Sequence, residues 1–120
     1  MDELRTRMRK TLAAALRNPS HGTSPARIIE DAVKGEMGAL LLADYSLSRG
    51  ALFVLEAVHE ASVEAHLDPT EAMCAALRGI ADLRRVVQPV RLDEIRIEVA
   101  ARYMGAGEVF SEYLRAPVLL

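Results

Sequence analysis

The chain has 120 residues and a formal net charge of -2, so it offers no general electrostatic attraction to nucleic acid or to an anionic membrane. Hydrophobic residues make up 51% and charged residues 27%, a balance that excludes an intrinsically disordered chain. With no Trp, three Tyr and two Phe, the apolar residues are mostly Ala and branched aliphatics, which favours packed helices over a β-sandwich.

The length fits one domain, so residues 1–120 are predicted to form a single helical domain. Cys74 is the only cysteine and cannot form an internal disulfide, which fits a reducing compartment. The N-terminal residues alternate in charge and lack the apolar core of a secretory signal. The most apolar run, residues 37–55, is interrupted by charges and falls short of the ~20 residues that a membrane span needs. We therefore expect a cytoplasmic protein that does not enter a membrane.

Residues 3–17 have the apolar spacing of a first helix. Large apolar side chains recur every four residues and share one face, namely Leu4, Met8, Leu12 and Leu16. The same segment carries five cations, which are Arg5, Arg7, Arg9, Lys10 and Arg17. A basic helix can contact phosphates. Because no aromatic platform or helix-turn-helix pattern accompanies it, we expect a solvated charged face and keep a nucleic-acid-associated regulator as an alternative.

A second helix is predicted to begin at Ser24 and Pro25, since Ser is a good N-cap and Pro is tolerated at the first helical position. Apolar residues continue at helical spacing as far as Leu41. Gly35 and Gly38 lie inside this pattern, where each costs about 1 kcal/mol relative to Ala. Because the periodicity runs through both glycines, we expect another backbone to approach the helix closely there.

A junction at residues 44–48 separates the second helix from a third, predicted over residues 49–66. Asp68, Pro69 and Glu71 form a capping-box pattern that begins a fourth helix. An apolar stripe continues along this fourth helix, which is predicted to stop before Pro89; the stripe is Met73, Ala76, Leu77, Ile80, Leu83 and Val87.

The pattern after Pro89 has two interpretations. Apolar and charged residues alternate over residues 90–99, which is typical of a short hairpin, although no other segment offers a strand to pair with it. Alternatively, residues 93–104 form a helix that is buried on two faces and ends at Gly105. A last helix is predicted over residues 108–115, followed by an apolar tail that we expect to dock. The predicted fold is an all-α, compact bundle of four to six helices.

The stretch "EAVHEASVEAH" contains the strongest candidate for a metal site. Glu56 and His59 are three residues apart, so they share a helix face and both can reach one ion. Ferritin-like carboxylate proteins use this E-x-x-H unit twice, together with further glutamates from neighbouring helices. A homodimer would supply the second copy, with Glu30 or Glu36 as the extra carboxylate and iron or another divalent metal as the ion.

The same helix also has a simpler interpretation. Glu56, Glu60 and Glu64 form a row at four-residue spacing beside the apolar arc, as a solvated stripe does. His66 lies next to the Asp68 boundary and more readily ends its helix than binds a metal. We therefore predict no cofactor and keep the metal site at Glu56 and His59 as an alternative.

Two further residues carry reactive side chains without a partner in the pattern. Cys74 is flanked by apolar residues, and no nearby base is available to activate it, so we expect a small buried thiol. His21 lies in a loop rich in Pro, Gly and Ser, where nothing fixes the geometry that a hydrolytic site requires.

The amount of apolar surface is the feature that bears most on function. A monomer of this size would struggle to cover the apolar faces of residues 37–55 and 95–104 together with the tail, and large exposed apolar patches mark interfaces. We expect a non-enzymatic protein that forms a homodimer or docks on another protein as an adaptor or regulatory subunit. The preferred interface elements are Gly35, Gly38 and the last two helices.

Overall fold

Three polar residues, Ser24, Ser46 and Asp68, begin successive helices in the computed structural model of the protein, which describes residues 2–18 and 22–118. The Ser24 hydroxyl accepts a hydrogen bond from the Arg27 N–H at 3.2 Å. The Asp68 carboxylate accepts one from the Thr70 N–H at 2.9 Å. These bonds satisfy N–H groups that have no partner within the helix, so both predicted caps are confirmed.

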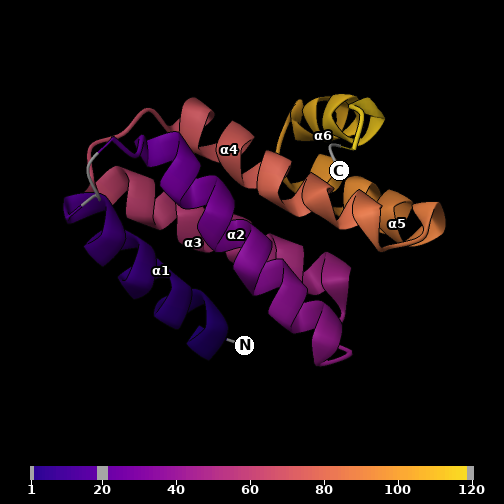
Figure 1. The fold of residues 1–120 in the computed structure, drawn as a ribbon, viewed down its shortest axis with the longest axis horizontal. Coiled ribbons are helices and arrows are strands. Elements are labelled where there is room, and N and C mark those ends of the chain that lie inside the picture. The colour runs from indigo at the N-terminus through magenta and orange to yellow at the C-terminus, as the bar shows by residue number, and fades with distance from the viewer. Residues whose placement is uncertain (1, 19–21, 119–120) are drawn as a thin grey trace.

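The described residues form six α-helices and no strand and are 81% helical, which confirms the all-α bundle. The helices are α1 (Asp2–Arg17), α2 (Pro25–Leu42), α3 (Leu47–Glu64), α4 (Pro69–Ala81), α5 (Pro89–Arg102) and α6 (Ala106–Arg115), with a short 3-10 helix η1 (Asp82–Arg85) after α4. α1 lies at one side of the molecule and α5 and α6 at the other, with α2, α3 and α4 between them (Figure 1). None of the described helices is long and apolar enough to cross a membrane.

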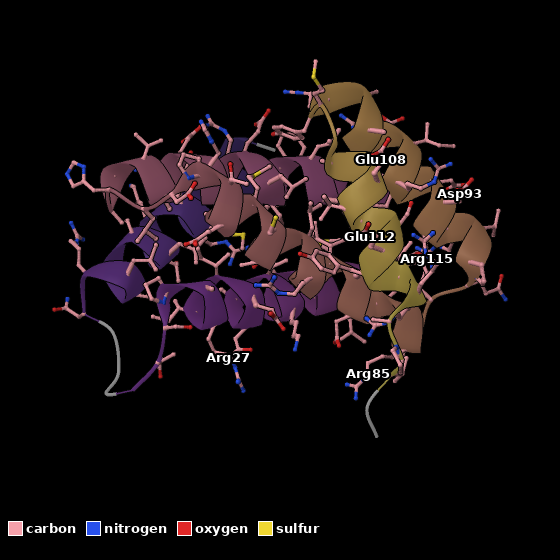
Figure 2. The ribbon with its side chains drawn as sticks, turned by 90° about the horizontal axis from the view of Figure 1, so that it is seen from above. Arg27, Arg85, Asp93, Glu108, Glu112 and Arg115 are labelled. Carbon is pink, nitrogen blue, oxygen red and sulfur yellow. The ribbon has the colours of Figure 1, made fainter. Side chains whose placement is uncertain are left out.

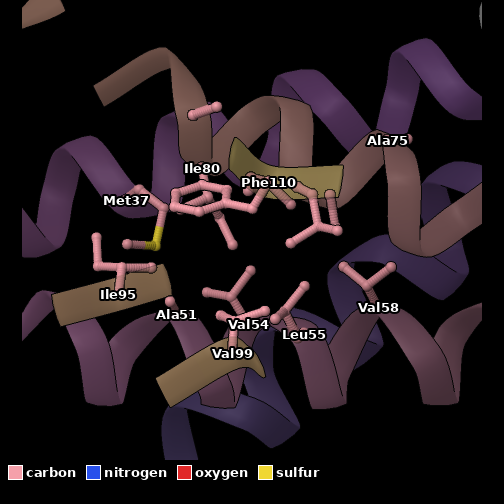
Figure 3. Packing of buried hydrophobic residues seen from close by; sticks show 14 of the residues in the cluster. Met37, Ala51, Val54, Leu55, Val58, Ala75, Ile80, Ile95, Val99 and Phe110 are labelled. Carbon is pink, nitrogen blue, oxygen red and sulfur yellow. The ribbon is translucent and has the colours of Figure 1, made fainter. Parts of the chain in front are cut away.

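The core takes side chains from all six α-helices, with Met8 and Leu12 coming from α1. Fully buried side chains point toward one another from α2, α3, α4, α5 and α6, including Met37, Leu55, Ile80, Ile95 and Phe110 (Figure 3). Phe110 is the largest of them and comes from the last helix, so α6 is anchored to the core by an aromatic ring rather than lying loosely on the surface.

The close backbone approach occurs at a different glycine from those predicted. A Cβ added to Gly35 or Gly38 would meet nothing within 4 Å, so that prediction is wrong for contacts within the described chain, although the helix is continuous through both positions as expected. At Gly79 an added Cβ would lie 2.8 Å from the Glu30 carbonyl oxygen and 2.8 Å from Val33 Cβ. Gly79 on α4 is therefore what lets α2 and α4 pack closely.

The segment after Pro89 is a helix, so the hairpin interpretation is wrong. Leu92, Ile95 and Val99 are buried at helical spacing. The expectation that this helix is buried on two faces is also wrong within the chain, because Ile97 is 52% exposed and Met104 is fully exposed. The apolar residues on the outer side of α5 thus have no covering element among the described residues.

The chain turns at Gly105, which has φ +80°, a conformation that glycine adopts without steric cost. α6 then begins at Ala106, two residues earlier than predicted, and packs tightly on α5, since an added Cβ at Gly107 would lie 2.6 Å from Ala100 Cβ. After α6, the Arg84 guanidinium donates hydrogen bonds to the carbonyls of Ala116 and Pro117 at 3.1 and 3.2 Å. These bonds hold the backbone of the first part of the tail, although the side chains of Ala116, Pro117 and Val118 are exposed. The docking of the apolar tail stays a prediction, since its last two residues lie outside the described chain.

Candidate functional site

The glutamates of the "EAVHEASVEAH" stretch belong to an ion-pair network, which we call the ionic ladder: Arg5 and Arg9 on α1, Glu56, Glu60 and Glu64 on α3, and Arg102 on α5. Arg5 pairs with Glu56 and Glu60, and Arg9 pairs with Glu60 at 3.4 Å and Glu64 at 2.6 Å. The row of carboxylates is therefore not a purely solvated stripe, because it attaches α1 to α3.

The four predicted metal ligands lie in separate surroundings. Glu56 is paired with both Arg5 and Arg102, and His59 is exposed on the same helix. Glu30 is paired with Lys34 and Arg78, and Glu36 accepts a hydrogen bond from Arg7 at 2.6 Å. Within the part of the chain that the structure describes, no three His, Cys, Asp or Glu side chains converge on a common point.

A metal would consequently have to displace an arginine or lysine from each of these glutamates. The hypothesis requires a second copy of the chain, which a single chain does not test, so the E-x-x-H site stays a prediction. His66 lies in the turn after α3, as predicted, with φ 56°.

The basic residues of α1 are also largely paired. Arg5, Arg7 and Arg9 all form ion pairs with glutamates of α2 or α3. Lys10 and Arg17 remain exposed on the outer side of the helix. Contacts to a phosphate backbone would therefore compete with ion pairs that the fold already makes.

An open apolar hollow lies between the start of α4 and the α5–α6 turn. This α4–α6 groove encloses about 490 Å³ and is lined chiefly by Met73, Cys74, Leu77, Tyr103, Met104 and Val109. Its floor is formed by buried or half-buried α4 residues, and its rim carries Met104, which is fully exposed. An apolar hollow with an exposed apolar side chain at its edge is a typical site for association with another apolar surface.

Two polar groups border the α4–α6 groove. Burial raises the pKa of the Tyr103 hydroxyl, and the negative charge of Glu56 raises it further, so this tyrosine stays protonated at neutral pH. Cys74 is half-buried in the groove wall rather than fully buried as predicted. His21, the other reactive side chain noted in the sequence, lies outside the described residues.

The groove was missed in the sequence because it depends on the direction of one turn. Gly105 was recognised as a helix end, but the pattern placed Met104 on a buried face. The positive φ of Gly105 instead turns the chain so that Met104 points outward and α6 folds back over α4. A glycine directly after a methionine at a helix end was the available signal.

Compared with known proteins, the chain matches no protein family, no curated protein and no solved structure.

Proposed function

We propose that the protein is a non-enzymatic, cytoplasmic homodimer whose two copies associate through the α4–α6 groove. The carrying observation is that a fully exposed methionine, Met104, stands at the rim of a 490 Å³ apolar hollow on the same surface. A two-fold dimer requires a surface that is complementary to itself. A projecting side chain next to a hollow meets that requirement, because each copy can insert its Met104 into the groove of the other.

The side chains that line the α4–α6 groove are suited to contact with a second copy of the chain. Met73 and Met104 are unbranched and polarizable, so they adapt to the shape of an opposing apolar surface. Ile97 continues the apolar surface along α5 and is also exposed. The one cation in the lining, Arg102, is already paired with Glu56, so closing the groove leaves no unpaired arginine in the contact.

The test is sedimentation velocity over about 1 to 100 µM protein for the wild type and three variants. Met104→Glu places a charge in the contact and is expected to weaken dimerisation at least ten-fold, the size of effect typical of a central interface residue, about 1.4 kcal/mol or more. Thr70→Trp fills the mouth of the groove from an exposed position on α4 and is expected to act in the same direction. Leu42→Glu is the matched control, since Leu42 is 88% exposed at the end of α2 and does not line the groove.

A wild-type chain that stays monomeric over this range contradicts the proposal. Dimerisation that is lost in Leu42→Glu but kept in Met104→Glu also contradicts the proposal. That result would indicate a dimer interface on the α2 surface near Gly35 and Gly38. Circular dichroism of each variant checks that the helices are retained, and Thr11→Trp on the exposed side of α1 controls for the added tryptophan.

A further inference from the structure

A second hollow, of about 260 Å³, lies where α2, α4, η1 and the segment after α6 meet. We call it the basic hollow, and its charged lining residues are Glu30, Lys34, Arg78, Asp82, Arg84 and Arg85. Among the described lining residues, four cations against two carboxylates leave a surplus of two positive charges, in a chain whose net charge is -2. The hollow therefore has the opposite sign of charge to the molecule as a whole.

The inner wall is a hydrogen-bonded group from α2 and α4. Glu30 accepts from Arg78 Nε at 3.0 Å and pairs with Lys34 Nζ at 3.2 Å. Burial alone would raise the pKa of Glu30, but the hydrogen bonds from Arg78 and Lys34 outweigh it and hold that pKa below its ordinary value. Burial would lower the pKa of Arg78, and the bonds to Glu30 and Tyr113 more than offset this. Glu30 and Arg78 consequently both stay charged around neutral pH.

The outer wall is held by η1. The Arg84 guanidinium donates hydrogen bonds to the carbonyls of Ala81, Ala116 and Pro117. These bonds hold the segment after α6 against the hollow. Arg85 pairs with Asp82 at 3.9 Å and lies next to that segment in Figure 2. The positions of these two arginines are therefore set by the backbone of η1 rather than by long flexible side chains alone.

Part of the donor capacity in this wall is not used by the protein. Arg78 donates hydrogen bonds through Nε and Nη1, and among the described residues its Nη2 donates no hydrogen bond. Lys34 Nζ has three N–H groups and forms a single ion pair, with Glu30. Arg78 and Lys34 are each more than a third exposed, so a ligand in solution can reach them.

We propose that the basic hollow binds a phosphate group, either as inorganic phosphate or as the phosphate of a small phosphomonoester. A phosphate dianion matches the surplus of two positive charges, and its oxygens accept the charge-assisted hydrogen bonds that Arg78 and Lys34 can still donate. The volume of 260 Å³ exceeds that of the phosphate itself and leaves room for the rest of a small molecule. This site is independent of the proposed dimer contact, since the two share no lining residue.

Calorimetric titration with inorganic phosphate at about pH 8 and low ionic strength tests the proposal. Lys34→Gln and Arg85→Gln each remove one positive charge from the hollow and are expected to weaken phosphate binding about ten-fold. Asp82→Asn removes one negative charge from the hollow, which raises its net positive charge by one, and is expected to strengthen phosphate binding. Arg49→Gln is the matched control, because Arg49 is exposed on α3 and does not line the hollow.

The opposite signs of these effects separate a phosphate site from a loss of folding, which would weaken binding in all variants. Titration with O-phosphoserine distinguishes the two sources: tighter binding than inorganic phosphate identifies a phosphomonoester, and weaker binding identifies the free ion. Absence of binding to both, equal affinity for acetate, or an Arg49→Gln effect as large as that of Lys34→Gln overturns the proposal.

Discussion

Gly79 shows how one residue sets the distance between two helices. Its missing side chain allows the Glu30 carbonyl and Val33 of α2 to approach to distances that a Cβ would not tolerate. Gly38 has the same intrinsic helix penalty but faces open space. The same residue type therefore has a packing role at one position and no packing role within the chain at the other.

Gly79→Ala and Gly38→Ala are expected to have opposite effects on the free energy of unfolding. Gly79→Ala forces α4 away from the α2 backbone and is expected to cost about 2 to 3 kcal/mol. Gly38→Ala is expected to gain about 0.5 to 1 kcal/mol through better helix propensity. Urea unfolding at one fixed protein concentration measures both. A Gly79→Ala variant as stable as the wild type would show that α2 and α4 are not in close contact there.

Glu30 is the carboxylate that links α2 to α4 through Arg78. We expect Glu30→Gln to lower the free energy of unfolding by about 0.5 to 1 kcal/mol at about pH 7, the size typical of a partly exposed ion pair. Because the pKa in the folded protein is below the ordinary value of 4.5, the contribution is fully present above 4.5 and is lost as pH falls through the folded pKa. The difference between variant and wild type should therefore shrink at about pH 3, and a difference that grows on acidification would contradict the pairing.

At the scale of elements, two helices end in the same way. Asp44 and His66 each have φ 56° and lie one residue beyond the C-caps of α2 and α3, which are Ala43 and Ala65. The His66 N–H donates to the Val63 carbonyl at 3.2 Å, and the Leu67 N–H donates to the Ser62 carbonyl at 2.9 Å. This is the Schellman pattern, in which glycine is usual and other residues pay a steric cost.

His66→Gly is expected to raise the free energy of unfolding by about 1 kcal/mol, because glycine adopts the left-handed conformation freely. His59→Gly, the same substitution at an exposed position inside α3, is expected to lower it by about 0.5 kcal/mol. Thermal unfolding followed by circular dichroism compares the two. Destabilisation by both substitutions would show that the His66 imidazole makes a contact worth more than the strain it relieves.

Element boundaries were predictable where a side chain caps the backbone, as at Ser24 and Asp68. η1 was not predictable, because Leu83 and Val87 continue the apolar spacing of α4 and a 3-10 turn alters that spacing too little to show in the pattern. The hairpin alternative for α5 arose from alternating charges at residues 90–99, which on a helix simply fall on its exposed sides.

At the scale of the whole molecule, the expected excess of apolar surface is present but distributed differently. Most of it is buried in a core shared by all six α-helices, and Phe110 fills the space that a smaller residue would leave empty. What remains exposed includes Ile97 on α5 and Met104 in the turn before α6, within the region that the sequence suggested as interface elements. Neither the α4–α6 groove nor the basic hollow was predictable, since each combines side chains from segments far apart in the sequence and depends on how helices turn after Gly105 and Ala81.

The ionic ladder has a consequence for how uniquely α1 is positioned. Both its arginines and its apolar residues repeat every four positions, and the glutamates of α3 repeat at the same interval. A slide of α1 by one helical turn, about 6 Å, would bring Arg5 opposite Glu64 and leave the apolar face still directed at α3. The ion pairs and the apolar spacing between these two helices therefore discriminate poorly between the two alignments. The pair of Arg7 with Glu36, which joins α1 to α2, is a contact that the slide would break.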